Sequence, residues 1–138
     1  MALAAALVAF ALLAGDAPDS MACAPDTAVV RSRALPTGDS VRVLQTILFP
    51  KAGGGAGTMT IEYLSTRPET DSDGLRVEAA ALAAELAPAA SAAGVRPTLA
   101  VVRVCHPTAP PPATALTRQF RFVPGPSGDW VPAVGASR

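Results

Sequence analysis

The sequence is poor in the residues that build metal centres and catalytic clusters. Its 138 residues include two cysteines and one histidine. His106 directly follows Cys105, and neighbouring residues of a strand point to opposite faces, so these side chains do not converge as a thiolate–imidazole pair. One histidine and one nearby cysteine also fall short of the three or four ligands of a zinc site. The sequence therefore predicts no metal and no cofactor, and it predicts that His106 is a surface residue at a strand end.

Two further segments lack parts that functional motifs of their kind require. The glycine-rich run 53–57 lacks the Gly-Lys-Ser/Thr ending of a phosphate-binding loop. It also precedes a predicted strand and not a helix, so it has no helix N-terminus to bind a phosphate. Glu69, Asp71 and Asp73 do not match the spacing of a twelve-residue calcium loop, and helix capping explains them more simply. The sequence also contains no Gly-x-Ser-x-Gly nucleophile elbow. No catalytic residue is predicted.

Excess charge of either sign is missing as well. The chain has 11 basic and 11 acidic residues, for a formal net charge of zero. Removal of an N-terminal segment containing Asp16 and Asp19 would leave a small positive excess. A charge so close to neutral argues against nucleic acid as a partner and against binding to a membrane surface.

The clearest feature that is present is the uncharged apolar run 2–14. It is shorter than the roughly 20 residues of a membrane-spanning helix and fits the apolar region of a secretory signal peptide. Polar residues follow it, and Ser20 and Ala22 place small side chains where a signal peptidase reads. We therefore expect residues 1–22 to be a signal peptide and the chain to be exported to the periplasm or the extracellular space. No Lys or Arg precedes the run, so either the free amino terminus supplies the positive charge or the true start lies upstream of Met1. An uncleaved N-terminal anchor and a cytosolic helix are the alternatives to export.

Cleavage after Ala22 makes Cys23 the first residue, which gives its thiol two competing uses. In an exported chain with only two cysteines, a disulfide between Cys23 and Cys105 is favoured. The alternative is a lipoprotein acylated at Cys23, although Ser20 stands where a lipoprotein signal usually has Leu. A lipid thioether consumes the thiol, so the two uses exclude each other. Two free thiols are the third alternative.

Residues 23–39 are predicted to be an N-terminal tether with a short edge strand at 27–30, and residues 40–138 a single domain. Alternation over 40–49 predicts a strand with Val41, Val43, Ile47 and Phe49 on one apolar face. A glycine-rich connector joins it to a second strand at 58–65. The short connection predicts an antiparallel hairpin.

A helix is predicted from about residue 75 to 93, and it is rich in alanine. It begins after the oxygen-bearing side chains of Asp71, Ser72 and Asp73, and Gly94 terminates it. Pro88 is expected to end or kink it. Apolar residues recur at three- and four-residue spacing and form the predicted buried stripe: Leu75, Ala79, Leu82, Leu86 and Ala90.

The remaining strands are predicted at 98–105, 116–123 and 129–131. The strand at 98–105 is almost wholly apolar and is therefore predicted to be the central strand. A right-handed crossover through the helix is expected to join it to the strand at 58–65. The proline-rich run 106–115 is predicted to be an extended loop. The order strand, strand, helix, strand, strand predicts an α+β two-layer sandwich, with one helix packed on a four- to five-stranded sheet.

Four residues are the candidate ligand-binding side chains. Arg42 and Arg103 would hold an anion if they shared an uncovered sheet face, and Tyr63 or Trp130 would line a pocket between helix and sheet. Solvated arginines that pair partly with Glu62 are the simpler interpretation. We therefore expect a small exported, non-enzymatic accessory or binding domain of the cell envelope, with an envelope protein or a second copy as the candidate partner. The alternatives are the Cys23 lipoprotein, docked on a membrane partner, and a ligand-binding domain or minor enzyme.

Overall fold

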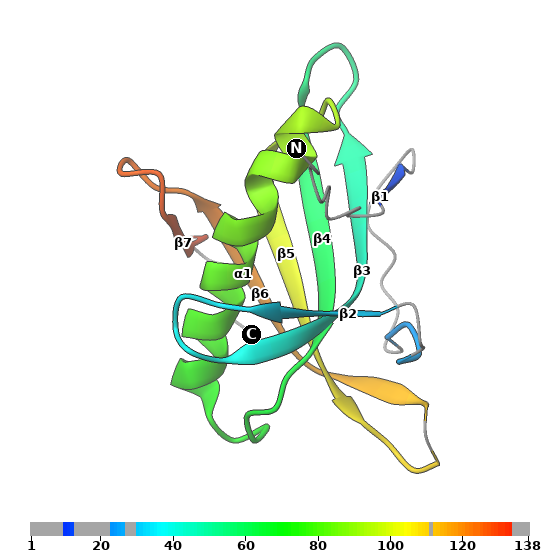
Figure 1. Ribbon diagram of the computed structural model, residues 1–138. Coiled ribbons are helices and arrows are strands. Elements are labelled where there is room, and N and C mark those ends of the chain that lie inside the picture. Colours follow the sequence, from blue (N-terminus) through cyan, green and yellow to red (C-terminus); the bar gives the residue numbers. More distant parts are fainter. Residues whose placement is uncertain (1–9, 13–22, 27–29, 111, 134–138) are drawn as a thin grey trace, which may run out of the picture.

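One helix packs on one face of a mixed β-sheet, as Figure 1 shows from the helix side. The computed structural model describes residues 10–12, 23–26, 30–110 and 112–133. The predicted α+β two-layer sandwich is confirmed. The elements are β1 (Phe10–Leu12), β2 (Arg31–Ala34), β3 (Ser40–Pro50), β4 (Ala56–Leu64), α1 (Ser72–Ala92), β5 (Arg96–Pro107), β6 (Thr114–Pro124) and β7 (Trp130–Pro132).

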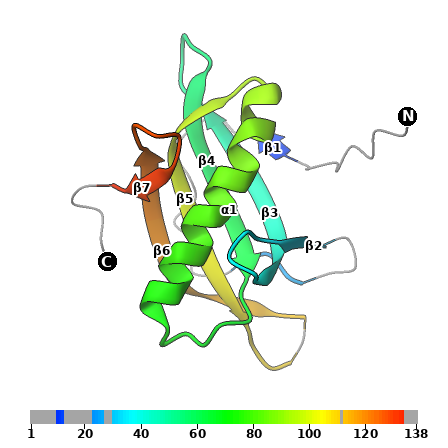
Figure 2. The same ribbon diagram turned by 60° about the vertical axis from the view of Figure 1, so that its left-hand side comes forward.

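The strands are ordered β1-β3-β4-β5-β6-β7, and β2 pairs with β3 as well. The β3–β4 pair is the predicted antiparallel hairpin, and β4 and β5 are parallel strands joined through α1. The β5–β6 and β6–β7 pairs are antiparallel. The described part of the sheet has seven strands instead of the expected four or five, because the short strands β1 and β2 also pair with β3. Figure 2 shows α1 lying obliquely across the sheet.

The predicted apolar face of β3 is wrong in one respect. A β-bulge shifts the β3–β4 register just after Val43, and a bulge reverses the inside–outside alternation of the residues that follow it. Val41 lies in the core beneath α1 and Val43 packs against that core. After the bulge Leu48 takes the core position, so Ile47 and Phe49 point to the opposite face.

The helix has the predicted buried stripe, since all five of its apolar positions are buried. It begins at Ser72, where the Asp71 side chain accepts a hydrogen bond from the Gly74 N–H at 3.1 Å. Pro88 does not end the helix, which continues to Ala92. Gly94, with φ of 98°, follows in the left-handed conformation that glycine adopts without steric cost.

The main core lies between α1 and the sheet, and alanine on the helix lets the two layers approach closely. Its buried members are Leu35, Val41, Leu48, Met59, Ile61, Tyr63, Leu75, Ala79, Leu82, Ala83, Leu86, Ala90, Val95, Ala100, Val102, Val104 and Phe122.

The N-terminal region contributes more to the sheet than a tether does. Residues 10–12, inside the predicted signal peptide, form β1 beside β3, whereas residues 1–9 and 13–22 lie outside the described residues. In the predicted tether, β2 forms at 31–34, and residues 27–29 of the predicted edge strand lie outside the described residues. Among the described residues, no helix is long and apolar enough to span a membrane.

The predicted disulfide is confirmed: Cys23 and Cys105 are bonded, with their Cα atoms 6.4 Å apart. Cys105 belongs to the β5 face opposite α1, because its neighbour Val104 lies in the core. The bond therefore fixes the segment 23–26 on the sheet face that α1 leaves open. Two hydrogen bonds hold the segment beside it, from the Ala24 N–H to Glu62 and from the Thr114 hydroxyl to the Ala24 carbonyl, both 2.9 Å long.

Candidate functional site

The four predicted ligand-binding residues lie on two different faces of the sheet. Arg42 and Arg103 point away from α1, whereas Tyr63 is buried beneath it and Trp130 packs against the same core from β7. The arginines therefore share a face, as the anion-site hypothesis requires, but the two aromatic residues do not join them.

On the open face, Arg103 and Glu62 form a buried ion pair. Their side chains are 5% and 7% exposed, and Arg103 Nε donates to Glu62 Oε2 at 2.9 Å. Gln45 and the Ala24 N–H both donate to Oε1 of the same carboxylate, at 2.8 and 2.9 Å. Gln119 accepts a longer bond from Arg103 at 3.3 Å. This network joins four strands, β3 to β6, to the N-terminal segment.

Arg42 is also engaged with the N-terminal segment. Its Nε and Nη2 atoms both donate to Oδ1 of Asp26, at 3.0 and 2.8 Å. A backbone bond of 3.1 Å from the Asp26 N–H to the Pro112 carbonyl secures the same residue from the other side. The two candidate arginines thus bind carboxylates of this chain, which makes them part of the attachment of residues 23–26.

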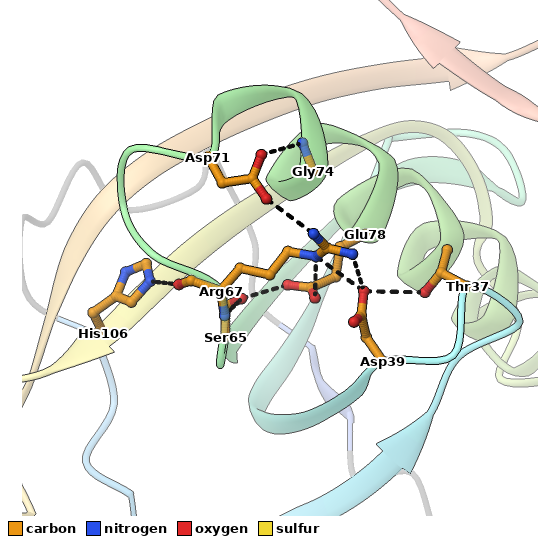
Figure 3. A network of polar contacts seen from close by, with 8 residues as sticks. All are labelled: Thr37, Asp39, Ser65, Arg67, Asp71, Gly74, Glu78 and His106. Carbon is orange, nitrogen blue, oxygen red and sulfur yellow. Dashed lines mark hydrogen bonds and ion pairs between the residues drawn. The ribbon is translucent and has the colours of Figure 1, made fainter.

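Figure 3 shows a second polar network, beside the N-terminus of α1, that the sequence pattern does not predict. Arg67 is its centre, in the loop between β4 and α1. Its guanidinium donates to Asp39 at 2.8 and 3.0 Å and to Asp71 at 2.9 Å. Its Nε atom also lies 3.4 Å from Oε2 of Glu78, whose side chain is fully buried. Arg67 therefore ties the β2–β3 turn, the loop and the helix together.

Charge pairing in this network shifts the pKa values of two half-buried members, Asp39 and Arg67. The hydrogen bond from Arg67 holds the pKa of Asp39 below its ordinary value, and the same bond is the main cause that raises the pKa of Arg67. Glu78 is stabilised further by the Ser65 hydroxyl, which donates to its Oε1 atom at 2.6 Å. The carboxylates around Arg67 are engaged within the protein, so this network is a structural tie.

One sequence signal marks Glu78 in advance. It stands three residues after Leu75 and four before Leu82, on the apolar stripe of the helix. An acidic residue on a buried stripe requires a cationic partner nearby. Arg67 meets that requirement from an adjacent loop.

The prediction that His106 lies at the surface is wrong, because the residue is 9% exposed and bonded on both ring nitrogens. Nε2 donates to the Arg67 carbonyl at 2.7 Å, and Nδ1 lies 2.6 Å from the Thr117 hydroxyl. β5 extends to Pro107 and keeps His106 inside the sheet. The histidine thereby fixes the backbone of the loop that carries Arg67.

Tyr63 is the most unusual group in this region. Its hydroxyl is buried and has no hydrogen-bond partner among the residues that the structure describes. Burial raises the pKa of Tyr63 far above its ordinary value, and the negative charge of Glu78 raises it further. The phenol therefore stays neutral for as long as the protein is folded.

This environment predicts a loss of stability in alkali. An unfolded tyrosine releases its proton near pH 10, whereas folded Tyr63 keeps it, so stability is full below about pH 10 and falls above it by about 1.4 kcal/mol per pH unit. The Tyr63→Phe variant should lack this decline and should be at least as stable at neutral pH. Urea unfolding of both proteins between pH 8 and about 10.5 measures the difference. Because the chain has one tyrosine, phenolate absorbance gives a second readout. Phenolate appearing before unfolding would contradict the prediction.

A groove lies where the C-terminal half of α1 meets the start of β5 and the β6–β7 hairpin. Its volume is about 520 Å³, within the range of small-molecule sites. Trp130 and three prolines give it apolar walls, and Arg96 is the one charged residue among those that line it. Arg96 is exposed and makes no side-chain hydrogen bond or ion pair with the residues that the structure describes. The lining residues are Ala84, Ala87, Pro88, Ser91, Arg96, Pro97, Thr98, Pro124, Gly128 and Trp130.

Of the predicted site residues, the groove thus includes only Trp130.

In the described part of the chain, no three His, Cys, Asp or Glu side chains are placed to hold a metal ion together. The chain matches no family model, no curated protein and no solved structure.

Proposed function

We propose that the chain is a small exported binding domain of the cell envelope, without catalytic activity, that takes an apolar molecule bearing one carboxylate into the Trp130 groove. The apolar run 2–14 supports export, and the disulfide is typical of proteins that fold in an oxidising compartment. The observation that carries the proposal is the groove itself.

The chemistry of the groove favours this class of ligand. Trp130 offers a broad apolar ring, and Pro88, Pro97 and Pro124 have no backbone N–H to be desolvated on binding. Arg96 supplies fork-shaped donors that match a carboxylate. Its guanidinium forms no ion pair with the described residues, so a ligand anion does not displace an internal partner.

The lipoprotein alternative is less well supported. Acylation needs the Cys23 sulfur, and that sulfur is bonded to Cys105. Segment 23–26 also makes its own contacts with the sheet, which an acylated N-terminus extending to a membrane would have to leave. The disulfide-bonded domain therefore remains the better proposal.

Fluorescence of Trp130 tests the proposal directly, because it is the only tryptophan in the chain. The purified protein is titrated with a panel of aromatic and fatty carboxylates and with the corresponding alcohols and amines. Saturable changes in intensity or emission wavelength are expected for carboxylates, with affinity about tenfold weaker for the alcohols, because the charge-assisted bond to Arg96 is lost.

Two arginine variants provide the matched comparison. Arg96→Gln should weaken carboxylate binding by about tenfold. Arg121→Gln removes an exposed arginine of β6 outside the groove and should leave affinity unchanged. Equal effects of both variants, or no saturable response to any carboxylate, would refute the proposed site.

A further inference from the structure

The outer edge of β3 is covered by two separate N-terminal segments. β2 pairs with its first part, from Ser40 to Val43, and β1 pairs in parallel with Thr46 to Leu48. β4 occupies the other edge. β3 thus depends on two short strands to satisfy its outer hydrogen-bonding groups.

These two covering strands differ in their expected fate. β2 follows Cys23 in the sequence and belongs to the part retained after the predicted cleavage. β1 lies inside the predicted signal peptide 1–22, so cleavage removes it. In the chain that begins at Cys23, no strand in the described ranges pairs with the edge from Leu44 to Phe49. An open edge of this kind is a template for pairing with another strand.

The open stretch lacks the charged residues that usually protect an edge strand, and the bulge at its start leaves residues 45–49 in regular pairing with β4. Natural edges carry charges, and above all lysine, that oppose association. The run Leu44-Gln-Thr-Ile-Leu-Phe49 contains no charged residue. Its edge accepts an added strand in the full-length chain, as the β1 pairing shows.

We propose that, after the leader is removed, this edge pairs antiparallel with the same edge of a second copy and forms a two-fold symmetric dimer. The proposal rests on the proposed export. A second copy fits because the open stretch is bounded by β2 at one end and by Pro50 at the other. A pair centred near Ile47 places the β2 strand of each copy beyond Pro50 of the other, where it does not obstruct pairing. The same surface then serves both partners, as a two-fold interface requires.

The test begins with the full-length gene expressed in a host that exports the protein. Intact mass gives the N-terminus, light scattering gives the oligomeric state, and hydrogen exchange locates the protected amides. We expect a chain beginning at Cys23 and a mass in solution twice that of the chain. Those amides of 44–49 that do not face β4 should exchange about tenfold or more slowly as protein concentration rises.

Two lysine variants make the test specific to this edge. Leu44→Lys puts a charge into the open stretch and should yield a monomer with an unchanged disulfide and circular dichroism spectrum. Val131→Lys puts the same charge into β7, at the opposite edge of the sheet, and should leave the dimer intact.

Four results would overturn the proposal. The first is a monomer beginning at Cys23 in which the amides of 44–49 that face away from β4 exchange rapidly at every concentration. The second is a dimer protected only elsewhere, and the third is a complex in which another protein protects 44–49. The fourth is a recovered chain that keeps residues 10–12. The mass measurement reports leader removal separately from dimerisation. Neither depends on carboxylate binding, so failure of the dimer is distinguishable from failure of the proposed function.

Discussion

Reduction of the Cys23–Cys105 disulfide is expected to lower the free energy of unfolding by about 4–5 kcal/mol. The bond joins residues 82 positions apart. A cross-link over so long a loop removes much of the conformational entropy of the unfolded chain. Because domains of this size are stable by only about 5–15 kcal/mol, the loss is a large part of the total. The melting temperature should fall by roughly 15–20 °C.

Thermal unfolding of the wild-type protein with and without reductant measures this effect while leaving every side chain in place. Mass spectrometry verifies that reduction is complete, through a gain of two hydrogens. The Cys23→Ala, Cys105→Ala double variant should unfold at or below the temperature of the reduced protein, because Cys105 is fully buried and its replacement leaves a cavity. An unchanged melting temperature after complete reduction would contradict the loop-entropy explanation.

Local periodicity accounts for the parts of the fold that the sequence predicts correctly. The stripe from Leu75 to Ala90 repeats at helical spacing, and each of its members is buried in the structure. The β3–β4 hairpin and the parallel crossover follow from short connections and from the handedness of strand–helix–strand units. Such rules act over a few residues and need no knowledge of the rest of the chain.

Features that depend on strand register and on tertiary packing were not predictable in the same way. The bulge after Val43 inserts an extra residue between two strands, which reverses the face of Ile47 and Phe49 without any signal in the alternating pattern. Pro88 remains inside the helix because tertiary packing on both sides outweighs the lost hydrogen bond. His106 is buried because β5 continues into a proline-rich segment that the composition assigned to a loop.

The candidate site shows the same division. Trp130 was identified as a pocket residue from its size and position, and it does line the groove. Arg96 was not, since an arginine near a helix end has no distinguishing pattern. Arg42 and Arg103 were identified as charges on strands, but their carboxylate partners are 16 and 41 residues away in the sequence. The predicted pairing of an arginine with Glu62 is present, but the prediction that the arginines are solvated is wrong for Arg103, which is buried with its partner between neighbouring strands.

The Arg103→Met variant is expected to lower the free energy of unfolding by about 3–5 kcal/mol, because it leaves Glu62 charged, buried and without its cation. The methionine retains apolar volume, so the effect comes mainly from the uncompensated carboxylate. Gln45 and the Ala24 N–H still donate to Glu62, but two neutral donors do not replace a guanidinium. Urea unfolding at neutral pH measures the change.

The double variant Arg103→Met, Glu62→Leu separates the role of the pair from that of either residue. Removing both charges together should recover most of the lost stability, since apolar residues of similar volume often replace a buried ion pair at little cost. Arg96→Gln provides the control, because replacing an exposed arginine that has no partner among the described residues should change stability by less than about 0.5 kcal/mol. If Arg103 instead exists to bind a ligand anion, Arg103→Met should leave stability nearly unchanged. If the stability loss of the double variant equals the sum of the losses of the two single variants, the two side chains are not coupled. The buried pair would then not be the interaction that holds the open face of the sheet to residues 23–26.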